Sequence, residues 1–209
     1  MHFFGTVQQL ASIPESVLDE AFDTVKQLQP EDFKYRDTNT ETKASSWWRT
    51  DGWLKAEGPV IKLKPLAFSI AKLITDQWPY PETVSLSYFN VSVITPNEFI
   101  EEHVDPKLSN KLSYRVLVPL NPGIIFKYHW LIKGQKIYNQ IKRGHAYHFN
   151  NNDIHAAYNT SDQLRYALMY DFTEDRLFSK FAHTLDWHLG LVADTANKNF
   201  LKRHIGHVY

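Results

Sequence analysis

The 209-residue sequence contains no cysteine, which excludes a disulfide-stabilised scaffold and any metal site built from thiolates. Any metal must therefore be held by histidine and carboxylate side chains. The sequence also lacks an apolar run long enough to span a bilayer, and its N-terminus lacks a basic segment followed by an apolar core. These absences predict a cytoplasmic protein that does not enter a membrane.

An excess of charge of either sign is absent as well. Lys and Arg together number 23, as do Asp and Glu. Such a balance produces no strong overall field that would draw the protein onto nucleic acid or an anionic membrane. A nucleic-acid partner is therefore not expected from composition.

Aromatic and apolar residues are plentiful. The chain is 43% hydrophobic and 14% aromatic, with 6 Trp, 11 Tyr and 13 Phe. Its length suits a single domain, 1–209, with a sizeable core. The aromatic content is typical of a β-rich core and of a pocket that stacks against a ligand.

The N-terminal part, residues 1–83, predicts two helices joined by an aromatic loop. The first helix is expected over 12–29, with Ser12 as N-cap and Glu15 completing a capping box. The second is expected over 65–77, with Pro65 near its start. A third helix, 174–189, and a tail are expected within the C-terminal part, 173–209.

The central part, residues 84–172, alternates between apolar and polar residues and is rich in β-formers, with turn residues every eight to twelve positions or so. This pattern is typical of a sandwich or jelly-roll barrel, so we predict a mainly β, cupin-like jelly roll (a double-stranded β-helix) with flanking helices. The predicted strands cover 84–93, 99–104, 113–119, 124–131, 136–141, 145–149, 154–158 and 164–172.

Between the two N-terminal helices, residues 31–60 are polar and broken but hold three tryptophans within 47–53. One interpretation is an Ω-like loop that packs its own aromatic side chains. The other is a lid or wall of a substrate pocket, in which Trp48 or Arg49 touches the substrate.

A candidate metal site begins at His103 and Asp105, whose side chains point the same way if both lie on one strand. His155 follows 52 residues later, on a strand that a jelly roll can return beside the first. Two imidazoles and one carboxylate form the facial triad that is diagnostic of non-haem Fe(II) oxygenases. We therefore predict that His103, Asp105 and His155 hold Fe(II).

Arg165 lies ten residues beyond His155, in the middle of an apolar and aromatic strand. A buried guanidinium needs a partner and offers a carboxylate two parallel hydrogen bonds, as the distal end of 2-oxoglutarate requires. The alternative is an ion pair with Asp171 or a glutamate. Arg115 is a second mid-strand arginine, which could bind the co-substrate, bind an acidic substrate group or form a buried ion pair. His129 could line the pocket.

Three segments together resemble the 2-oxoglutarate/Fe(II) dioxygenases of the aspartyl/asparaginyl β-hydroxylase type, which include bacterial hydroxylases of free proline. They are Glu102-His103-Val104-Asp105, residues 114–123, and GHAYHFNNNDIHAAYNTSDQLRYALMYDF at 144–172. The animal protein-modifying members of this group lack the metal-binding carboxylate, whereas Asp105 is present here. The sequence is therefore closer to the smaller bacterial hydroxylases or phage-type relatives.

The resemblance implies a jelly roll that uses Fe(II), 2-oxoglutarate and O₂ and releases succinate and CO₂. It implies His103, Asp105 and His155 as metal ligands, Arg165 as the anchor of 2-oxoglutarate, and Arg115 as a pocket partner. The expected reaction is hydroxylation of an unactivated C–H bond in an amino acid or a peptidyl side chain. No general base is required, so no catalytic residue is predicted beyond the metal ligands. The alternatives are a non-catalytic cupin-like module that binds a metal or small molecule, and a dioxygenase that modifies nucleic acid.

Overall fold

A computed structural model describes residues 7–28, 35–37, 47–49, 59–79, 84–104, 113–132, 134–149 and 153–174. These residues form two helices, α1 (Glu15–Val25) and α2 (Pro59–Asp76), together with antiparallel strands. The strands are β1 (Gln8–Ser12), β2 (Tyr35–Asp37), β3 (Trp47–Arg49), β4 (Val84–Ile94), β5 (Phe99–His103), β6 (Ser113–Pro119), β7 (Phe126–Ile132), β8 (Gln135–Ile141), β9 (His145–Phe149), β10 (Ile154–Tyr158) and β11 (Arg165–Glu174).

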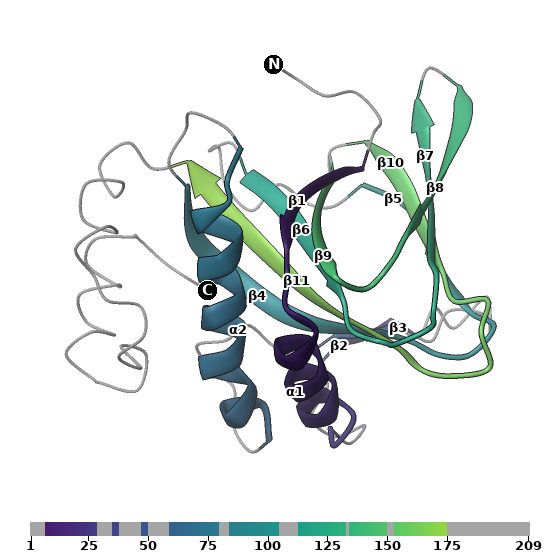
Figure 1. The fold of residues 1–209 in the computed structure, drawn as a ribbon. Coiled ribbons are helices and arrows are strands. Elements are labelled where there is room, and N and C mark those ends of the chain that lie inside the picture. The colour runs from purple at the N-terminus through teal and green to yellow at the C-terminus, as the bar shows by residue number, and fades with distance from the viewer. Residues whose placement is uncertain are drawn as a thin grey trace.

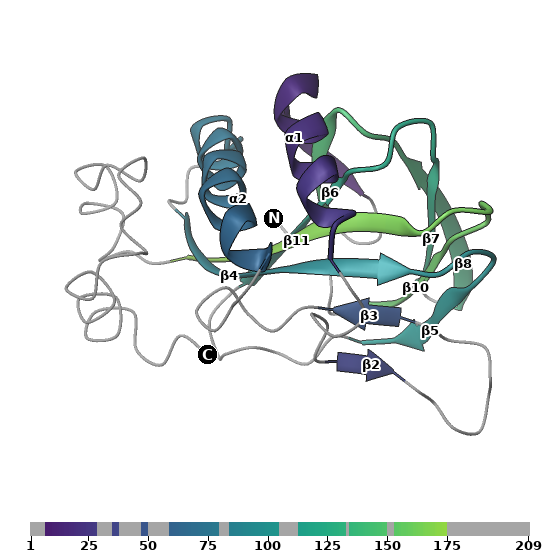
Figure 2. The ribbon, with the colours of Figure 1, turned by 90° about the horizontal axis from the view of Figure 1, so that it is seen from below.

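The strands form two sheets. A seven-stranded sheet has the order β1-β9-β6-β11-β4-β3-β2, and a four-stranded sheet has the order β5-β10-β7-β8. Both helices lie on one face of the larger sheet, and the smaller sheet lies on the other side of the molecule (Figures 1 and 2). Strands that follow one another in the chain can belong to different sheets. For example, β4 and β6 belong to the larger sheet, whereas β5 belongs to the smaller.

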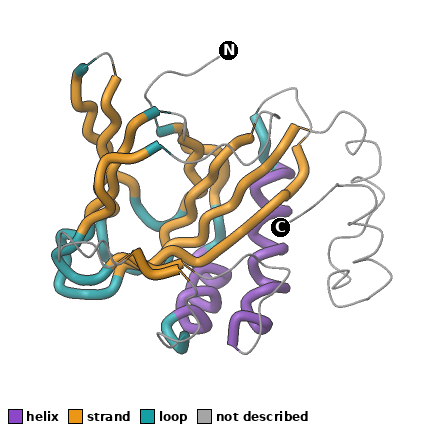
Figure 3. The backbone as a smooth tube through the Cα atoms, turned by 180° about the vertical axis from the view of Figure 1, so that it is seen from behind, coloured by secondary structure: helices purple, strands orange, loops and turns teal. Residues whose placement is uncertain are grey.

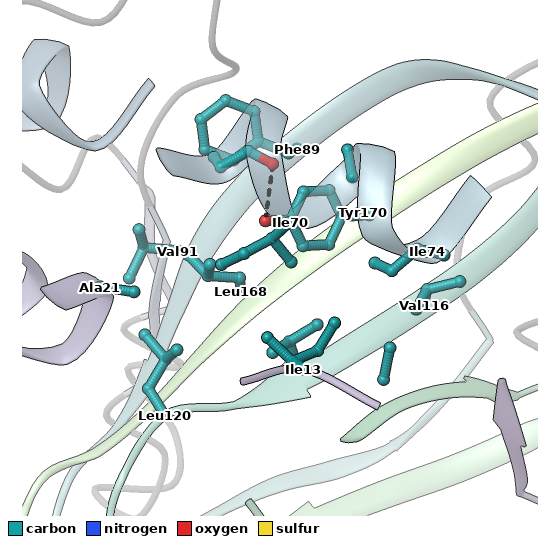
Figure 4. Close-up of a cluster of buried hydrophobic side chains, with 14 of the residues drawn as sticks. Ile13, Ala21, Ile70, Ile74, Phe89, Val91, Val116, Leu120, Leu168 and Tyr170 are labelled. Atoms are coloured by element: carbon teal, nitrogen blue, oxygen red, sulfur yellow. Dashed lines mark hydrogen bonds between the residues drawn. The ribbon is translucent and has the colours of Figure 1, made fainter. Parts of the chain in front are cut away.

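The larger sheet is buried on both faces. The face toward the helices is formed by apolar residues at every second position of the central strands. On β11, Leu168, Tyr170 and Phe172 point toward the helices, where they join Ile70 and Ile74 of α2. Figure 4 shows this cluster, in which the Tyr170 hydroxyl donates a hydrogen bond to the Ala67 carbonyl at 3.1 Å. Burial of such apolar area is the main stabilising term of the fold.

The opposite face of the larger sheet meets the smaller sheet across a second apolar cluster. Its members come from both sheets: Ile94, Leu117, Phe126, Tyr128, Trp130, Ile141, Tyr147, Phe149, Ala157 and Ala167. Seen from behind, the strands of the smaller sheet curve away from the helices (Figure 3). The space between the two sheets is therefore part core and part candidate site.

The predicted mainly β core is confirmed. Each of the eight strands predicted over 84–172 is present, with bounds shifted by at most two residues. On the last strand, Arg165 and Met169 line the space between the sheets, whereas Leu168 and Tyr170 pack on the opposite face, toward the helices.

The N-terminal predictions need two corrections. Ser12 does not cap α1, since it ends β1 and Pro14 occupies the N-cap position without a side-chain hydrogen bond. Helix α2 begins at Pro59, so Pro65 lies inside it rather than near its start. Buried apolar residues on both sides of Pro65, including the fully buried Leu63 and Ala67, hold the helix together despite the missing amide donor.

The aromatic segment 31–60 is only partly described. Its described backbone forms β2, β3 and the start of α2. Because β3 lies between β2 and β4 in the larger sheet, the predicted loop is wrong at 47–49. The predicted helix 174–189 and the tail lie outside the described residues, except that Glu174 ends β11. None of the described helices is long and apolar enough to cross a membrane.

Candidate active site

A pocket with an empty volume of about 500 Å³, some of it open to solvent, lies between the two sheets. Its lining comes from seven strands and combines polar and apolar side chains. The residues are Asn90, Ser92, Ile100, His103, Arg115, Leu117, Tyr128, Phe149, His155, Ala157, Arg165 and Met169. Four residues predicted to form the site, His103, Arg115, His155 and Arg165, therefore line one cavity.

His103 and His155 are direct neighbours across the β5–β10 pair. Their ring centroids are 4.4 Å apart. His155 is 4% exposed, and its ring contacts Phe149 at a centroid distance of 5.5 Å and Trp130 at 6.3 Å. This aromatic packing restricts the orientation of the His155 imidazole.

The two imidazoles are held in the same way by the backbone. The Nδ1 atom of His103 donates to the Glu101 carbonyl at 2.6 Å, and that of His155 donates to the Asp153 carbonyl at 2.8 Å. A ring that donates its Nδ1 proton keeps the lone pair on Nε2, which is the arrangement of a metal-binding histidine with an orienting hydrogen bond. Two such rings fit a divalent metal that prefers imidazole and carboxylate ligands.

Asp105, the third predicted ligand, lies outside the described residues. Within the described part of the chain, no three His, Cys, Asp or Glu side chains come together as a metal site. The two histidines therefore supply two of the three predicted ligands, and β5 ends two residues before Asp105 in the sequence.

Arg165 is 3% exposed and sits against two aromatic rings. Its guanidinium carbon lies 4.1 Å from the ring centroid of Phe126 and 4.6 Å from that of Tyr128. It donates hydrogen bonds to the Tyr158 carbonyl at 2.8 Å and to the Tyr128 hydroxyl. Among the residues that the structure describes, no carboxylate pairs with this guanidinium.

Burial is the main influence on the pKa of the Arg165 guanidinium. Desolvation lowers the pKa of Arg165 and raises the pKa of Tyr128, while the interaction between the two side chains partly opposes both shifts. A buried cation whose described neighbours are all neutral is costly unless a ligand brings the compensating charge. The site is therefore suited to an anion.

Arg115 has a different environment from Arg165. Its Nε and Nη2 atoms donate to the two oxygens of Asp171 at 2.8 and 2.9 Å, and both side chains are buried. The ion pair considered for Arg165 is thus formed by Arg115, which also lines the cavity. The two arginines differ in that only Arg115 has a described carboxylate partner.

Three polar groups of the cavity were not predicted from sequence. They are Ser92, the Tyr128 hydroxyl and Asn90, which is 3% exposed. The Oδ1 atom of Asn90 has no hydrogen-bond partner among the described residues. Alternation along β4 could have indicated Asn90 and Ser92, because both fall on the face opposite the apolar Phe89 and Val91.

The prediction for His129 is corrected by the structure. His129 is fully buried but is not among the residues that line the cavity. The neighbouring Tyr128 and Trp130 point between the sheets, so His129 points to the outer face of the smaller sheet. There it bonds to Glu102 and Tyr158.

Trp48 and Arg49, the other predicted substrate contacts, lie on β3. Their backbones pair with Val93 and Ser92 of β4. Since Ser92 lines the cavity, β3 runs next to the wall of the site. This backbone register is the evidence that bears on a substrate-contacting role for Trp48 and Arg49.

Comparison with known proteins identifies one family. The model of the aspartyl/asparaginyl beta-hydroxylase family matches residues 15–175. A search of the curated proteins finds no match.

Solved structures with the same fold include a prolyl-4-hydroxylase from Pseudomonas putida, with 12% identity and a TM-score of 0.54, covering 82% of this chain and 92% of that chain. AviO1 from Streptomyces viridochromogenes Tue57 has 9% identity and a TM-score of 0.55, covering 82% and 91%. The non-heme alpha ketoglutarate dependent epimerase SnoN from nogalamycin biosynthesis has 8% identity and a TM-score of 0.56, covering 81% and 79%. These likenesses confirm the predicted jelly roll.

Proposed function

Because the chain belongs to the aspartyl/asparaginyl β-hydroxylase family and is a 2-oxoglutarate-dependent oxygenase, we propose that it hydroxylates an unactivated C–H bond of an amino acid or a peptidyl side chain. The observation that carries this proposal is Arg165. It is a buried cation without a described carboxylate partner, in the same cavity as two histidines oriented as metal ligands.

His103, Asp105 and His155 would hold Fe(II). The hydrogen bonds from Nδ1 to the carbonyls of Glu101 and Asp153 orient both rings so that Nε2 would be the ligand atom. When bound, Fe(II) with 2-oxoglutarate and O₂ supplies the oxidising chemistry, and the co-substrate leaves as succinate and CO₂.

Arg165 would anchor the distal carboxylate of 2-oxoglutarate with two charge-assisted hydrogen bonds. The Tyr128 hydroxyl, already bonded to Arg165, would lie beside that carboxylate. Phe126 packs against the guanidinium and restricts its orientation. Arg115 is held by Asp171, which is six residues from Arg165 along β11, so it would contact an acidic group of the substrate rather than the co-substrate.

The substrate would occupy the part of the cavity farther from Arg165. Asn90 pairs with Met169, which is four residues from Arg165 along β11, or about 13 Å at about 3.3 Å per residue. 2-Oxoglutarate at neutral pH carries no hydrogen-bond donor. The Oδ1 of Asn90, which has no partner within the described part of the chain, therefore suits an N–H or O–H group of the substrate. We assign Trp48 and Arg49 to the rim of the site beside Ser92, which pairs with Ala167, two residues from Arg165 along β11.

The apolar lining has a separate role. Ile100, Leu117, Phe149 and Met169 surround the polar groups and leave few sites for water. Exclusion of water strengthens the electrostatic contact between Arg165 and a bound carboxylate.

The test is a turnover screen with purified protein, Fe(II), 2-oxoglutarate and O₂ against a panel of free amino acids and short peptides. The expected result is a substrate whose mass rises by one oxygen atom, with an equivalent amount of succinate. The matched control is His155→Ala, which should give neither product. Oxygen insertion at the wild-type rate in this variant would contradict the proposed site.

A further inference from the structure

The outer face of the smaller sheet carries a hydrogen-bonded network of four side chains, Glu102, His129, Lys136 and Tyr158. Glu102 accepts hydrogen bonds from His129 Nε2 at 2.8 Å and from Lys136 Nζ at 2.6 Å. Tyr158 bonds to the other ring nitrogen of His129 at 2.8 Å. We call this set the outer-face network.

The chemistry of the partners sets the direction of these bonds. A carboxylate only accepts, so His129 donates from Nε2, and its Nδ1 hydrogen-bonds to the Tyr158 hydroxyl. Both ring nitrogens of the fully buried His129 are therefore satisfied. The network joins all four strands of the sheet, since β5, β7, β8 and β10 each contribute one member.

Strand β5, which carries His103, is at the edge of this sheet, and among the described strands it pairs with β10 alone. The pairing is irregular. His103 lies opposite His155, and Ile100 lies opposite Ala157, so three steps on β5 match two steps on β10. The extra residue is a β-bulge.

The bulge brings His103 into the site. Side chains three residues apart on a regular strand point to opposite faces, yet Ile100 and His103 both line the cavity. The bulge lies at Glu101 and Glu102, neither of which has a paired residue on β10. Glu102 points outward from this bulge into the outer-face network, and His103 follows it directly.

We propose that Glu102 and His129 are positioning residues, which hold the bulge of β5 so that His103 reaches the metal. This inference rests on the proposed function, because it takes His103 as a ligand. It assigns a role to the buried His129 that is separate from substrate contact. The link from Glu102 to His129 crosses β10, so it restrains the edge strand where its backbone pairing is interrupted.

The bond to His129 matters more than the bond to Lys136. The His129 side chain is 1% exposed, whereas Lys136 and Glu102 are 47% and 38% exposed. Exposed ion pairs are screened by water and contribute little, whereas a buried imidazole has no water to replace a lost partner. Loss of Lys136 should therefore leave the bulge in place.

The experiment measures Mn(II) binding by calorimetry, with Mn(II) as a redox-stable probe of the metal site. Glu102→Leu and His129→Phe should weaken Mn(II) binding by about tenfold or more, as loss of an orienting contact around a metal ligand does. Glu102→Gln keeps an oxygen acceptor for His129 and should stay within about threefold of wild type. Lys136→Met is the matched control and should bind as wild type does.

Two readouts separate positioning from general destabilisation. Thermal unfolding of the metal-free variants identifies those that remain folded at the titration temperature, and the EPR spectrum of bound Mn(II) reports the ligand geometry. Should His129→Phe fail to fold, the partly exposed Glu102 provides the decisive pair of variants. A folded Glu102→Leu protein with the wild-type Mn(II) affinity and EPR spectrum would overturn this inference but leave the proposed metal site standing. Failure of the unsubstituted protein to bind Mn(II) would overturn the proposed metal site as well, and that titration comes first.

Discussion

Replacing Arg165 with methionine separates a ligand-binding arginine from a structural one. The structure gives this guanidinium hydrogen bonds to the Tyr158 carbonyl and the Tyr128 hydroxyl but no described carboxylate. If two charge-assisted hydrogen bonds hold the distal carboxylate of 2-oxoglutarate, their loss costs about 3–6 kcal/mol at about 1.5–3 kcal/mol each. The affinity for 2-oxoglutarate should then fall by about two to four powers of ten.

The matched comparison is Arg115→Met. That change leaves the 1% exposed Asp171 as a buried, unpaired charge, and breaking a buried pair in this way costs about 3–5 kcal/mol of folding stability. Arg165→Met leaves no buried charge behind, so its free energy of unfolding should change much less. The assays are calorimetric titration of 2-oxoglutarate into Mn(II)-loaded protein and denaturant unfolding of the metal-free protein. Binding of 2-oxoglutarate by Arg165→Met within about threefold of wild type, or destabilisation equal to that of Arg115→Met, would refute the reasoning.

Three further predictions follow from the same contacts. His103→Ala should abolish conversion of 2-oxoglutarate to succinate, measured by mass spectrometry, and weaken Mn(II) binding in calorimetry. Asn90→Leu removes a buried carbonyl oxygen without a described partner, so denaturant unfolding should show stability unchanged or raised by about 1 kcal/mol, while 2-oxoglutarate affinity is retained. Burial lowers the pKa of His148 from 6.5 to about 4, so its neutral form is favoured in the fold. Stability should be full above pH 6.5 and fall by up to about 3 kcal/mol as the pH drops toward 4, a loss that His148→Phe should reduce in pH-dependent unfolding.

The β core could be predicted because its strands alternate and its turns carry distinctive residues. The strands β1 to β3, at the two ends of the larger sheet, could not, since β1 (Gln8–Ser12) is short and without alternation and β3 lies within a tryptophan-rich segment that resembled a loop. Their existence depends on pairing with β9 and β4, which are distant in sequence. The same holds for Pro65, which tertiary burial keeps inside α2.

The site was predictable in its composition more than in its arrangement. Spacing and strand periodicity placed His103, His155 and Arg165 in one cavity. Periodicity did not reveal the bulge of β5, because one extra residue is visible only in the pairing with β10. It also did not tell which face of β7 is inner, since both faces carry buried side chains, and so His129 was assigned to the wrong one. The partner of Arg115 is 56 residues away, at Asp171, and only the fold brings the two together.

The central claim is that this cavity holds Fe(II) and 2-oxoglutarate together. Its most direct test is titration of 2-oxoglutarate into the purified protein with and without Mn(II), the redox-stable substitute for Fe(II). The account predicts saturable binding with one 2-oxoglutarate per chain that requires the metal and is lost in His155→Ala. No binding in the presence of Mn(II), or equal binding with and without it, would contradict the account.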